Sequence, residues 1–177
     1  MLQSLRILSL LLLLPLLHAC KTGSETGGTD TWLEGKSITL LQKAETARVY
    51  HIAPFKEEAQ FVDEQFAGYP ILQGPIELYN EELQQVKQLL SDTSSYVFSE
   101  ELKMCLFTPN LGIEFSHKKG TSLEVLLSLD CNKTKIFRDG LEIFYGDIDP
   151  ARAELLNLFY PIFKNEPYFQ ALSTSQF

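Results

Sequence analysis

Hydrophobic positions repeat with two different periods along this chain. The segment 80–90 predicts an amphipathic helix, because its apolar residues are spaced by three and four and share one face. These residues are Leu83, Val86, Leu89 and Leu90. The period changes within 96–146: apolar and polar residues alternate over 111–117 and again over 123–131. That alternation predicts a β-hairpin with one apolar face and Gly120 in its loop.

Further strands are expected on both sides of this hairpin. Asp139-Gly140 is a strong signal for a two-residue turn, and residues rich in β-formers flank it. Tyr69-Pro70 and Gly74-Pro75 bracket a short apolar pair, and Pro109-Asn110 follows another candidate strand. The strands expected in addition to the hairpin are 47–52, 71–72, 102–108, 134–138 and 141–145.

Two more helices are predicted, and a third is compatible with the pattern over 37–46. The acidic segment 57–67 stops at Gly68, as a short helix with a glycine end does. Asp149 and Pro150 predict a helix start, with aspartate as N-cap and proline in the first turn. This last helix buries a stripe of apolar residues. Its stripe is Leu155, Leu156 and Phe159, with Ile162 and Phe163 continuing the same face.

The prolines limit that last helix. Pro161 lacks a backbone donor and crowds the preceding turn, so it is expected to end or kink the helix at about Tyr160. Pro167 is expected to stop any continuation. Together these elements predict one α+β domain over 31–177. We expect an antiparallel sheet of about four to six strands with two or three helices packed on one face.

The first nineteen residues have the pattern of a signal peptide. One positive charge, Arg6, precedes an eleven-residue apolar run, Ile7–Leu17, and a small residue, Ala19, follows it. The run is too short to cross a membrane, which takes about 20 apolar residues. We therefore exclude residues 1–19 from the fold.

Leu17-His18-Ala19-Cys20 resembles the lipobox of bacterial lipoproteins. The resemblance implies that Cys20 receives a diacylglycerol on its thiol, becomes the mature N-terminus and carries further acyl chains such as palmitate. Two buried acyl chains suffice for stable anchoring in a membrane. Lys21 follows, where an aspartate would often imply retention in the inner membrane, so the resemblance favours the outer membrane in a Gram-negative cell. The alternative is an ordinary secretory signal cut near Ala19.

A flexible tether is predicted directly after this cysteine. Residues 21–30 contain three glycines and no apolar side chain. Residues 20–30 would thus hold the folded domain close to a membrane of the cell envelope while leaving it free to reorient.

The net charge of the chain limits the classes of partner that it is expected to bind. It carries 15 basic and 23 acidic residues, a net charge of −8, and removing Arg6 with the signal peptide makes this −9. Such a balance argues against nucleic-acid binding, which needs a basic face. It argues equally against a polybasic membrane-surface module.

Cys105 and Cys131 are the cysteines that remain after lipidation of Cys20. Export to an oxidising compartment favours a disulfide between them, with two buried thiols as an alternative. A third possibility is thiol chemistry, in which either cysteine would pair with His117. His117 and His51 both also fit an ordinary structural role on a strand.

Little else in the sequence predicts chemistry. Asp147 and Asp149 lie close together, but the calcium-loop pattern is absent, and no metal or cofactor is predicted. Tyr168-Phe169 follows Pro167 with few expected partners, so an exposed aromatic binding patch is a hypothesis there.

These observations favour a lipid-anchored cell-envelope protein that is not an enzyme. Its membrane contact would be the N-terminal lipid, and its domain would bind an envelope protein or polymer. The alternative is a small envelope hydrolase or thiol enzyme that uses Cys105 or Cys131 with His117.

Overall fold

The computed structural model describes residues 35–57, 62–97, 103–118, 120 and 122–174. The predicted signal peptide, lipobox and tether fall within residues 1–34 and so lie outside the described residues. Within the described part of the chain, no helix is both long and apolar enough to cross a membrane.

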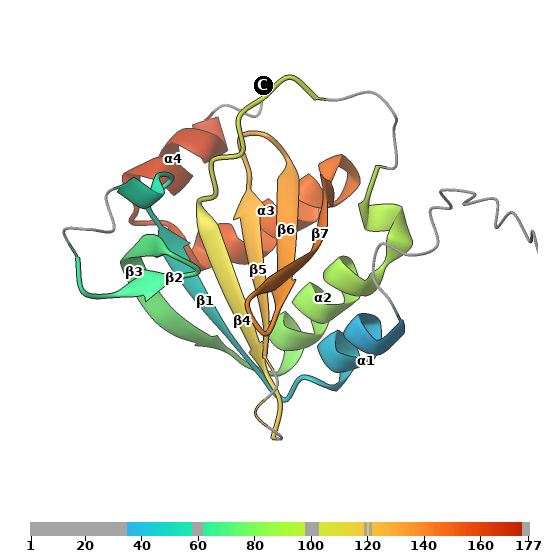
Figure 1. The fold of residues 1–177 in the computed structure, drawn as a ribbon. Coiled ribbons are helices and arrows are strands. Elements are labelled where there is room, and N and C mark those ends of the chain that lie inside the picture. The colour runs from blue at the N-terminus through green and yellow to red at the C-terminus, as the bar shows by residue number, and fades with distance from the viewer. Residues whose placement is uncertain (1–34, 58–61, 98–102, 119, 121, 175–177) are drawn as a thin grey trace, which may run out of the picture.

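The described residues form four α-helices, seven strands and two short 3-10 turns (Figure 1). The helices are α1 (Gly35–Lys43), α2 (Asn80–Ser91), α3 (Arg152–Phe163) and α4 (Pro167–Thr174). The strands are β1 (Thr46–Ile52), β2 (Gln65–Phe66), β3 (Tyr69–Leu78), β4 (Leu111–Ser116), β5 (Ser122–Ser128), β6 (Lys133–Arg138) and β7 (Leu141–Asp147). The 3-10 turns are η3 (Thr93–Ser95) and η4 (Asp149–Ala151).

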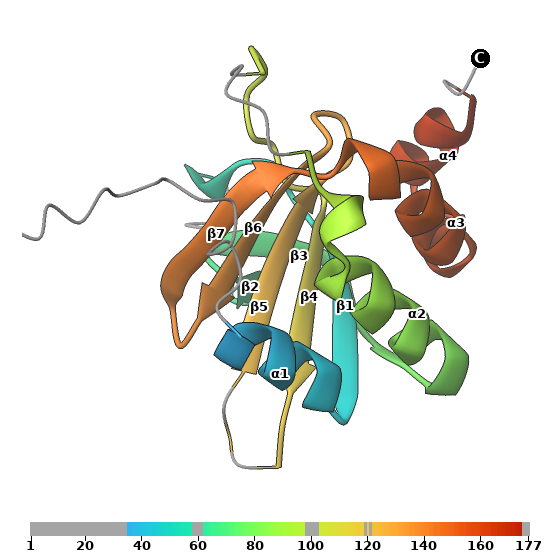
Figure 2. The same cartoon turned by 90° about the vertical axis from the view of Figure 1, so that its right-hand side faces the viewer.

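All seven strands belong to one curved sheet of order β2-β3-β1-β4-β5-β6-β7, in which every neighbouring pair is antiparallel. The helices lie together on one face of it (Figure 2). The prediction of an α+β domain with an antiparallel sheet is confirmed. The seven strands and four helices agree roughly with the expected four to six strands and two or three helices, and β2 and α4 are elements that the sequence did not predict.

Alternation of apolar and polar residues explains the central hairpin. In β4 and β5 the residues Ile113 and Val125 pair across the strands and point to the helices, whereas Glu114 and Glu124 pair on the opposite face. The predicted turn at Asp139-Gly140 joins β6 to β7, and both of its residues have positive φ, 52° and 77°. Positive φ at both positions is what a two-residue hairpin turn requires.

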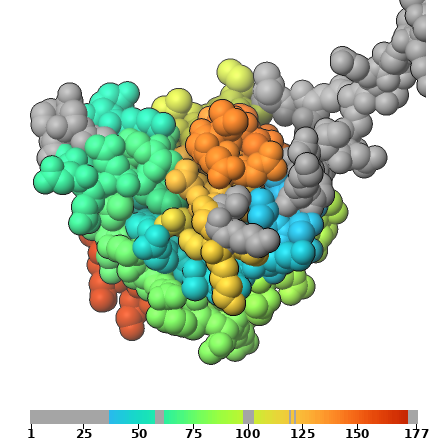
Figure 3. All heavy atoms as spheres, turned by 60° about the horizontal axis from the view of Figure 1, so that its bottom comes forward, coloured from blue at the N-terminus to red at the C-terminus, as the bar shows by residue number. Residues whose placement is uncertain are grey.

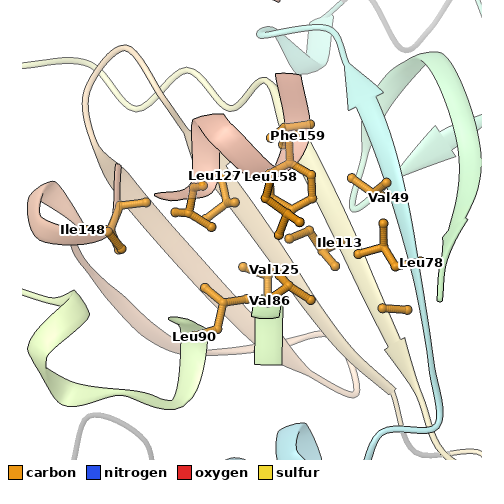
Figure 4. Close-up of a cluster of buried hydrophobic side chains, with 14 of the residues drawn as sticks. Val49, Leu78, Val86, Leu90, Ile113, Val125, Leu127, Ile148, Leu158 and Phe159 are labelled. Atoms are coloured by element: carbon orange, nitrogen blue, oxygen red, sulfur yellow. The ribbon is translucent and has the colours of Figure 1, made fainter. Parts of the chain in front are cut away.

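The main core lies between the sheet and the helices (Figure 4). Val86 and Leu90 of α2 and Phe159 of α3 reach down to the sheet, where they meet the apolar side chains of the central strands. The sheet side chains labelled in the figure are Val49, Leu78, Ile113, Val125 and Leu127. This packing fixes α2 and α3 next to each other above the sheet.

A smaller cluster occupies the other face of the sheet and contains no helix residue. Tyr50, Ile52, Phe66 and Leu126 are its buried members. The ring of Phe66 stacks on Tyr50, with centroids 4.8 Å apart, and lies directly over Gly112. A side chain at Gly112 would occupy the space of that ring.

One end of the molecule gathers two hairpin tips and the first helix. The turns of the β4–β5 and β6–β7 hairpins lie at this end, close to α1 (Figure 3). Arg138, the last residue of β6, donates a hydrogen bond of 3.2 Å to the hydroxyl of Ser37 in α1. This hydrogen bond joins α1 to strand β6 of the sheet.

Two predicted elements are wrong where the structure describes them, and a third is a strand that is longer than expected. Residues 62–67 contain strand β2 instead of the end of a helix over 57–67, because Phe66 packs into the smaller cluster. The expected two-residue strand at 71–72 is part of the ten-residue β3, which passes through both prolines. Residues 103–108 form no strand, because side-chain contacts of Lys103 and Cys105 hold this segment at the end of the sheet.

The C-terminal helices also differ in detail. The Asp149 side chain does not cap a helix, because it accepts hydrogen bonds from Lys103 and Asn132. Pro161 lies inside α3, which continues to Phe163 rather than ending at Tyr160. Pro167 begins α4 instead of stopping a helix, as its fixed φ suits the first helical turn.

Candidate binding groove

A groove of about 760 Å³ lies between α2 and α3 on the side away from the sheet. Each helix contributes one face to it, because the lining residues recur at spacings of three and four. On α2 these residues are Glu81, Glu82, Gln85, Gln88 and Leu89; on α3 they are Glu154, Asn157, Leu158, Pro161 and Ile162. Tyr79 and Asn80 lie at one end, and Asp92 and Ser95 at the other.

The two helices run in opposite directions along the groove. The turn η3 follows the end of α2, the turn η4 precedes the start of α3, and the two turns are in contact. The C-terminal end of α2 therefore lies beside the N-terminal end of α3. Asp92 and Glu154 consequently belong to one end of the groove, and Glu81 and Glu82 to the other.

Apolar side chains line the middle of the groove. Leu89 and Ile162 are half-buried, so part of their surface still contacts solvent, whereas Leu158 is buried. Gln85 and Gln88 of α2 and Asn157 of α3 are exposed beside them. Each of these amides offers donors and an acceptor. An apolar centre with amides at its margins is a usual composition for a ligand or peptide site.

Both ends of the groove are acidic. Glu81 and Glu82 lie at one end, Asp92 and Glu154 at the other, and no lysine or arginine is among the lining residues. Among the described residues, none of these four carboxylates forms an ion pair. No described lysine or arginine therefore pairs with the negative charge at either end of the groove.

Local helix chemistry explains why two of these acids are there. Glu82 accepts a hydrogen bond of 3.3 Å from the backbone N–H of Tyr79, which is the reach-back of a capping box at the start of α2. Asp92 accepts a hydrogen bond of 2.8 Å from the backbone N–H of Ser94. That bond lowers the pKa of Asp92 and keeps its carboxylate charged.

Cys105 and Cys131, predicted to bridge, are joined as a disulfide in the structure, with Cα atoms 6.0 Å apart. Neither cysteine lies in a strand: Cys105 is in the segment before Pro109, and Cys131 is in the turn between β5 and β6. Lys103 fastens the same region, since its ammonium group donates to the Cys131 carbonyl at 3.3 Å and also binds Asp149. The disulfide and the Lys103 contact together hold residues 103–105 against the turn between β5 and β6.

The structure does not bring His117 to either cysteine. His117 directly follows β4, at the end of the hairpin where Ser116 pairs with Ser122. Cys131 lies beyond the opposite end of β5, which Leu127 and its partner Leu111 mark. The full length of the strand separates the two residues, so they form no nucleophile–base pair.

His51, by contrast, lies in an aromatic and acidic environment. It is 5% exposed, and its ring faces those of Phe163, Tyr168 and Phe169 at centroid distances of 5.4–6.0 Å. Burial lowers the pKa of His51, while the nearby carboxylate of Glu166 opposes that shift. These contacts join the end of β1 to α4.

Tyr168 and Phe169 do not form the exposed aromatic patch that the sequence suggested. Phe169 is fully buried, and the hydroxyl of Tyr168 is buried as well. Burial and the neighbouring carboxylate of Asp130 raise the pKa of Tyr168. That prediction is wrong because both residues belong to an additional helix, α4, which packs against His51 and turns their rings toward it.

The remaining acidic candidates, Asp147 and Asp149, both form ion pairs with Lys103. Asp149 and Asp147 lie 2.5 and 3.7 Å from the Lys103 ammonium group. In the part of the chain that the structure describes, no group of three or more His, Cys, Asp or Glu side chains is placed to hold a metal ion.

A row of charged residues crosses the face of the sheet that carries no helix. The Arg48 guanidinium donates to Glu114 at 2.7 Å, and the hydroxyl of Tyr50 donates to the same carboxylate at 3.1 Å. Glu124 is the partner of Glu114 on the next strand. Burial raises the pKa of Glu124, and the charge of Glu114 raises it further.

Comparison with known proteins adds no relative. No family model, no curated protein and no solved structure matches this chain.

Sequence reasoning did not find the groove. The helical spacing of Leu89 placed it on the buried stripe of α2, although it borders the groove instead. The other helix did carry a usable signal. Its residues Asn157, Leu158 and Ile162 are one and four positions apart, so the sequence could have placed them on a shared helix face. No pattern in the sequence indicates that α2 and α3 lie side by side.

Proposed function

We propose that the protein is a lipid-anchored component of the bacterial cell envelope. It is not an enzyme, and it binds a polypeptide partner in the groove between α2 and α3. The observation that carries this proposal is the groove itself, which combines an apolar centre with exposed amides. Its volume lies within the range of about 300–1,000 Å³ that is usual for ligand sites.

The N-terminal residues support the location. Leu17-His18-Ala19-Cys20 has the pattern of a lipobox, and the polar segment 21–30 has the composition of a tether. A domain held in this way would present its surface close to the membrane. The partner would accordingly be another envelope protein.

The contacts of the cysteines and histidines favour a binding module over a thiol enzyme. Cys105 is paired with Cys131, so neither offers a thiolate. His117 lies at the other end of the hairpin from Cys131, and His51 is enclosed by aromatic rings.

The anchoring can be tested by metabolic labelling of the full chain with an alkyne analogue of palmitate in a Gram-negative host. We expect label on the wild-type chain and none on a Cys20→Ala variant, with the wild-type chain sedimenting with membranes. Labelling that persists in Cys20→Ala would contradict lipidation at this residue. A Cys105→Ala variant is the control, because the proposal leaves its labelling unchanged.

The groove can be tested with a photo-crosslinking amino acid at Gln88, an exposed residue of its wall. Lys118 is the matched control position, because it is exposed in the β4–β5 turn, away from the groove. We expect one discrete adduct at position 88, none at position 118, and loss of the adduct when Asn157→Trp fills the groove. The same adducts at both positions, or adducts unaffected by Asn157→Trp, would count against the proposal.

A further inference from the structure

We infer that the groove between α2 and α3 binds an extended basic segment with the pattern basic-x-apolar-x-basic. This inference rests on the proposed function of the groove and adds the chemical class of its partner. Three properties of the groove carry it: the sign of the charge at its ends, its apolar centre, and its length together with the amides along its walls.

The charge requires a cationic partner. Four carboxylates line the groove, two at each end, and no lysine or arginine lines it. Like charges repel, so an acidic segment would be rejected, whereas lysine or arginine side chains would neutralise both ends. The net charge of −8 for the chain acts in the same direction at longer range.

The apolar centre places an uncharged side chain between the two cations. Leu89 and Ile162 are half-buried, so each has area to cover, and the buried Leu158 lines the groove with them. An aliphatic side chain over these three would remove apolar surface from water. A charged side chain at the same position would have no partner among the lining residues, because the carboxylates lie at the ends.

The length of the groove follows from the helix that forms its wall. Glu81 and Asp92 mark its two ends along α2 and are eleven residues apart, which corresponds to about 16 Å at 1.5 Å per residue. In an extended chain the first and fifth residues are four steps of 3.3 Å, or about 13 Å, apart, and the long side chains of lysine or arginine cover the remaining distance to the carboxylates. A helical segment would need about twelve residues for the same span.

The amides along the groove distinguish these two conformations. A helical segment pairs its backbone groups internally and offers none of them to the side chains of Gln85, Gln88 and Asn157. An extended segment leaves its backbone N–H and C=O groups free to pair with these amides. The groove therefore favours an extended segment of about five residues.

Side-chain alternation then gives the spacing of the recognised residues. In an extended segment the side chains at the first, third and fifth positions point to the same side. The first and fifth would lie over the acidic ends and the third over the apolar centre. Gln85, Gln88 and Asn157 carry amides that can pair with the backbone of such a segment.

The experiment uses the full chain in nanodiscs of zwitterionic phosphatidylcholine, so that the membrane contributes no net charge. The probe is a fluorescent peptide with the core Lys-Ser-Leu-Ser-Lys between Gly-Ser flanks, and binding is followed by fluorescence anisotropy. Two comparison peptides have the cores Lys-Lys-Leu-Ser-Ser and Glu-Ser-Leu-Ser-Glu. The first keeps the composition and changes the spacing, and the second reverses the charge.

A double variant, Glu81→Gln with Glu154→Gln, removes one carboxylate from each end of the groove. Its matched control is Asp63→Asn with Glu64→Gln, which removes two exposed carboxylates just before β2. We expect the probe to bind at least tenfold more tightly than either comparison peptide. The groove variant should lose at least tenfold in affinity for the probe, and the control variant should keep the wild-type affinity.

Two results would overturn the inference. Equal binding of the Lys-Lys-Leu-Ser-Ser peptide would exclude the spacing, and an equal loss in the control variant would reduce the effect to overall charge. If the adduct at Gln88 forms and is lost in Asn157→Trp while the probe fails to bind, the basic partner is excluded and the binding function stands. If both fail, the proposed function fails as well.

Discussion

His51 Nδ1 lies 3.3 Å from a carboxylate oxygen of Glu166, although the histidine is almost completely buried. Burial disfavours the imidazolium ion, and the carboxylate favours it. Burial is the larger influence, so the pKa of His51 is lowered from its usual value near 6.5. Asp130 and Arg152 are further charged residues near the aromatic rings that cover His51.

A lowered pKa of His51 predicts a loss of stability in mild acid. Well above pH 6.5 the imidazole is neutral in both the folded and the unfolded chain, and its contribution to the free energy of unfolding is complete. As the pH falls below 6.5, the unfolded chain takes up a proton that the folded chain resists, so the free energy of unfolding decreases. The slope from this one group cannot exceed about 1.4 kcal/mol per pH unit.

Urea denaturation at pH 7.5, 6.5 and 5.5 measures this effect. The wild-type chain should lose stability across the series, and a His51→Gln variant should show a smaller slope, whatever its stability at pH 7.5. His117→Gln serves as the control, because it removes a histidine at the other end of the sheet and leaves His51 and Glu166 in place. A His51→Gln slope equal to that of the wild type would assign the acid sensitivity to other groups.

The disulfide is expected to protect both cysteines from alkylation and to stabilise the domain. In intact-mass measurements, neither Cys105 nor Cys131 should be alkylated before reduction, and both should be alkylated afterwards. A bridge between residues 26 apart in sequence contributes about 3.5 kcal/mol in the chain-entropy model. A Cys105→Ser/Cys131→Ser double variant should therefore unfold at lower urea. Alkylation of both thiols in the unreduced, folded protein would contradict the pairing.

The sequence predicted those parts of the fold that depend on local patterns. The hairpin β4–β5 follows from alternation, α2 from helical spacing, and the β6–β7 turn from Asp139-Gly140. The sequence failed where tertiary contacts override local signals. Strand β3 passes through Pro70, and α4 begins at Pro167, although both prolines were interpreted as ends of elements.

The candidate site was less accessible to sequence reasoning than the fold. The groove arises from two helices more than sixty residues apart in sequence, and only their packing on the sheet brings Leu89 close to Leu158. The cysteine pairing was expected from their number and from export. The burial of Phe169 was not, because nothing in the pattern showed that α4 would fold over His51.

Gly112 and Phe66 are expected to be energetically coupled. A Cβ atom at Gly112 would lie far inside normal contact distance of the Phe66 ring. Gly112→Ala should therefore destabilise the domain by about 1–3 kcal/mol, the usual cost of overpacking. In a Phe66→Leu background the same substitution should cost less, because the smaller side chain can yield. A double-mutant cycle from urea denaturation gives this coupling, and additive effects would contradict it.

The carboxyl group of Glu124 should respond to the charge of Glu114, its neighbour on the helix-free face of the sheet. Burial and then the charge of Glu114 raise the pKa of Glu124 above its usual value near 4.5. Glu114→Gln removes that charge but leaves the burial, so the pKa of Glu124 should fall and still remain above 4.5. The carboxyl carbon resonances in a pH titration by NMR report the two groups separately. Glu142→Gln is the control, since that carboxylate pairs with Lys135 and does not contribute to the shift at Glu124. An unchanged pKa of Glu124 in the Glu114→Gln variant would show that burial alone sets it.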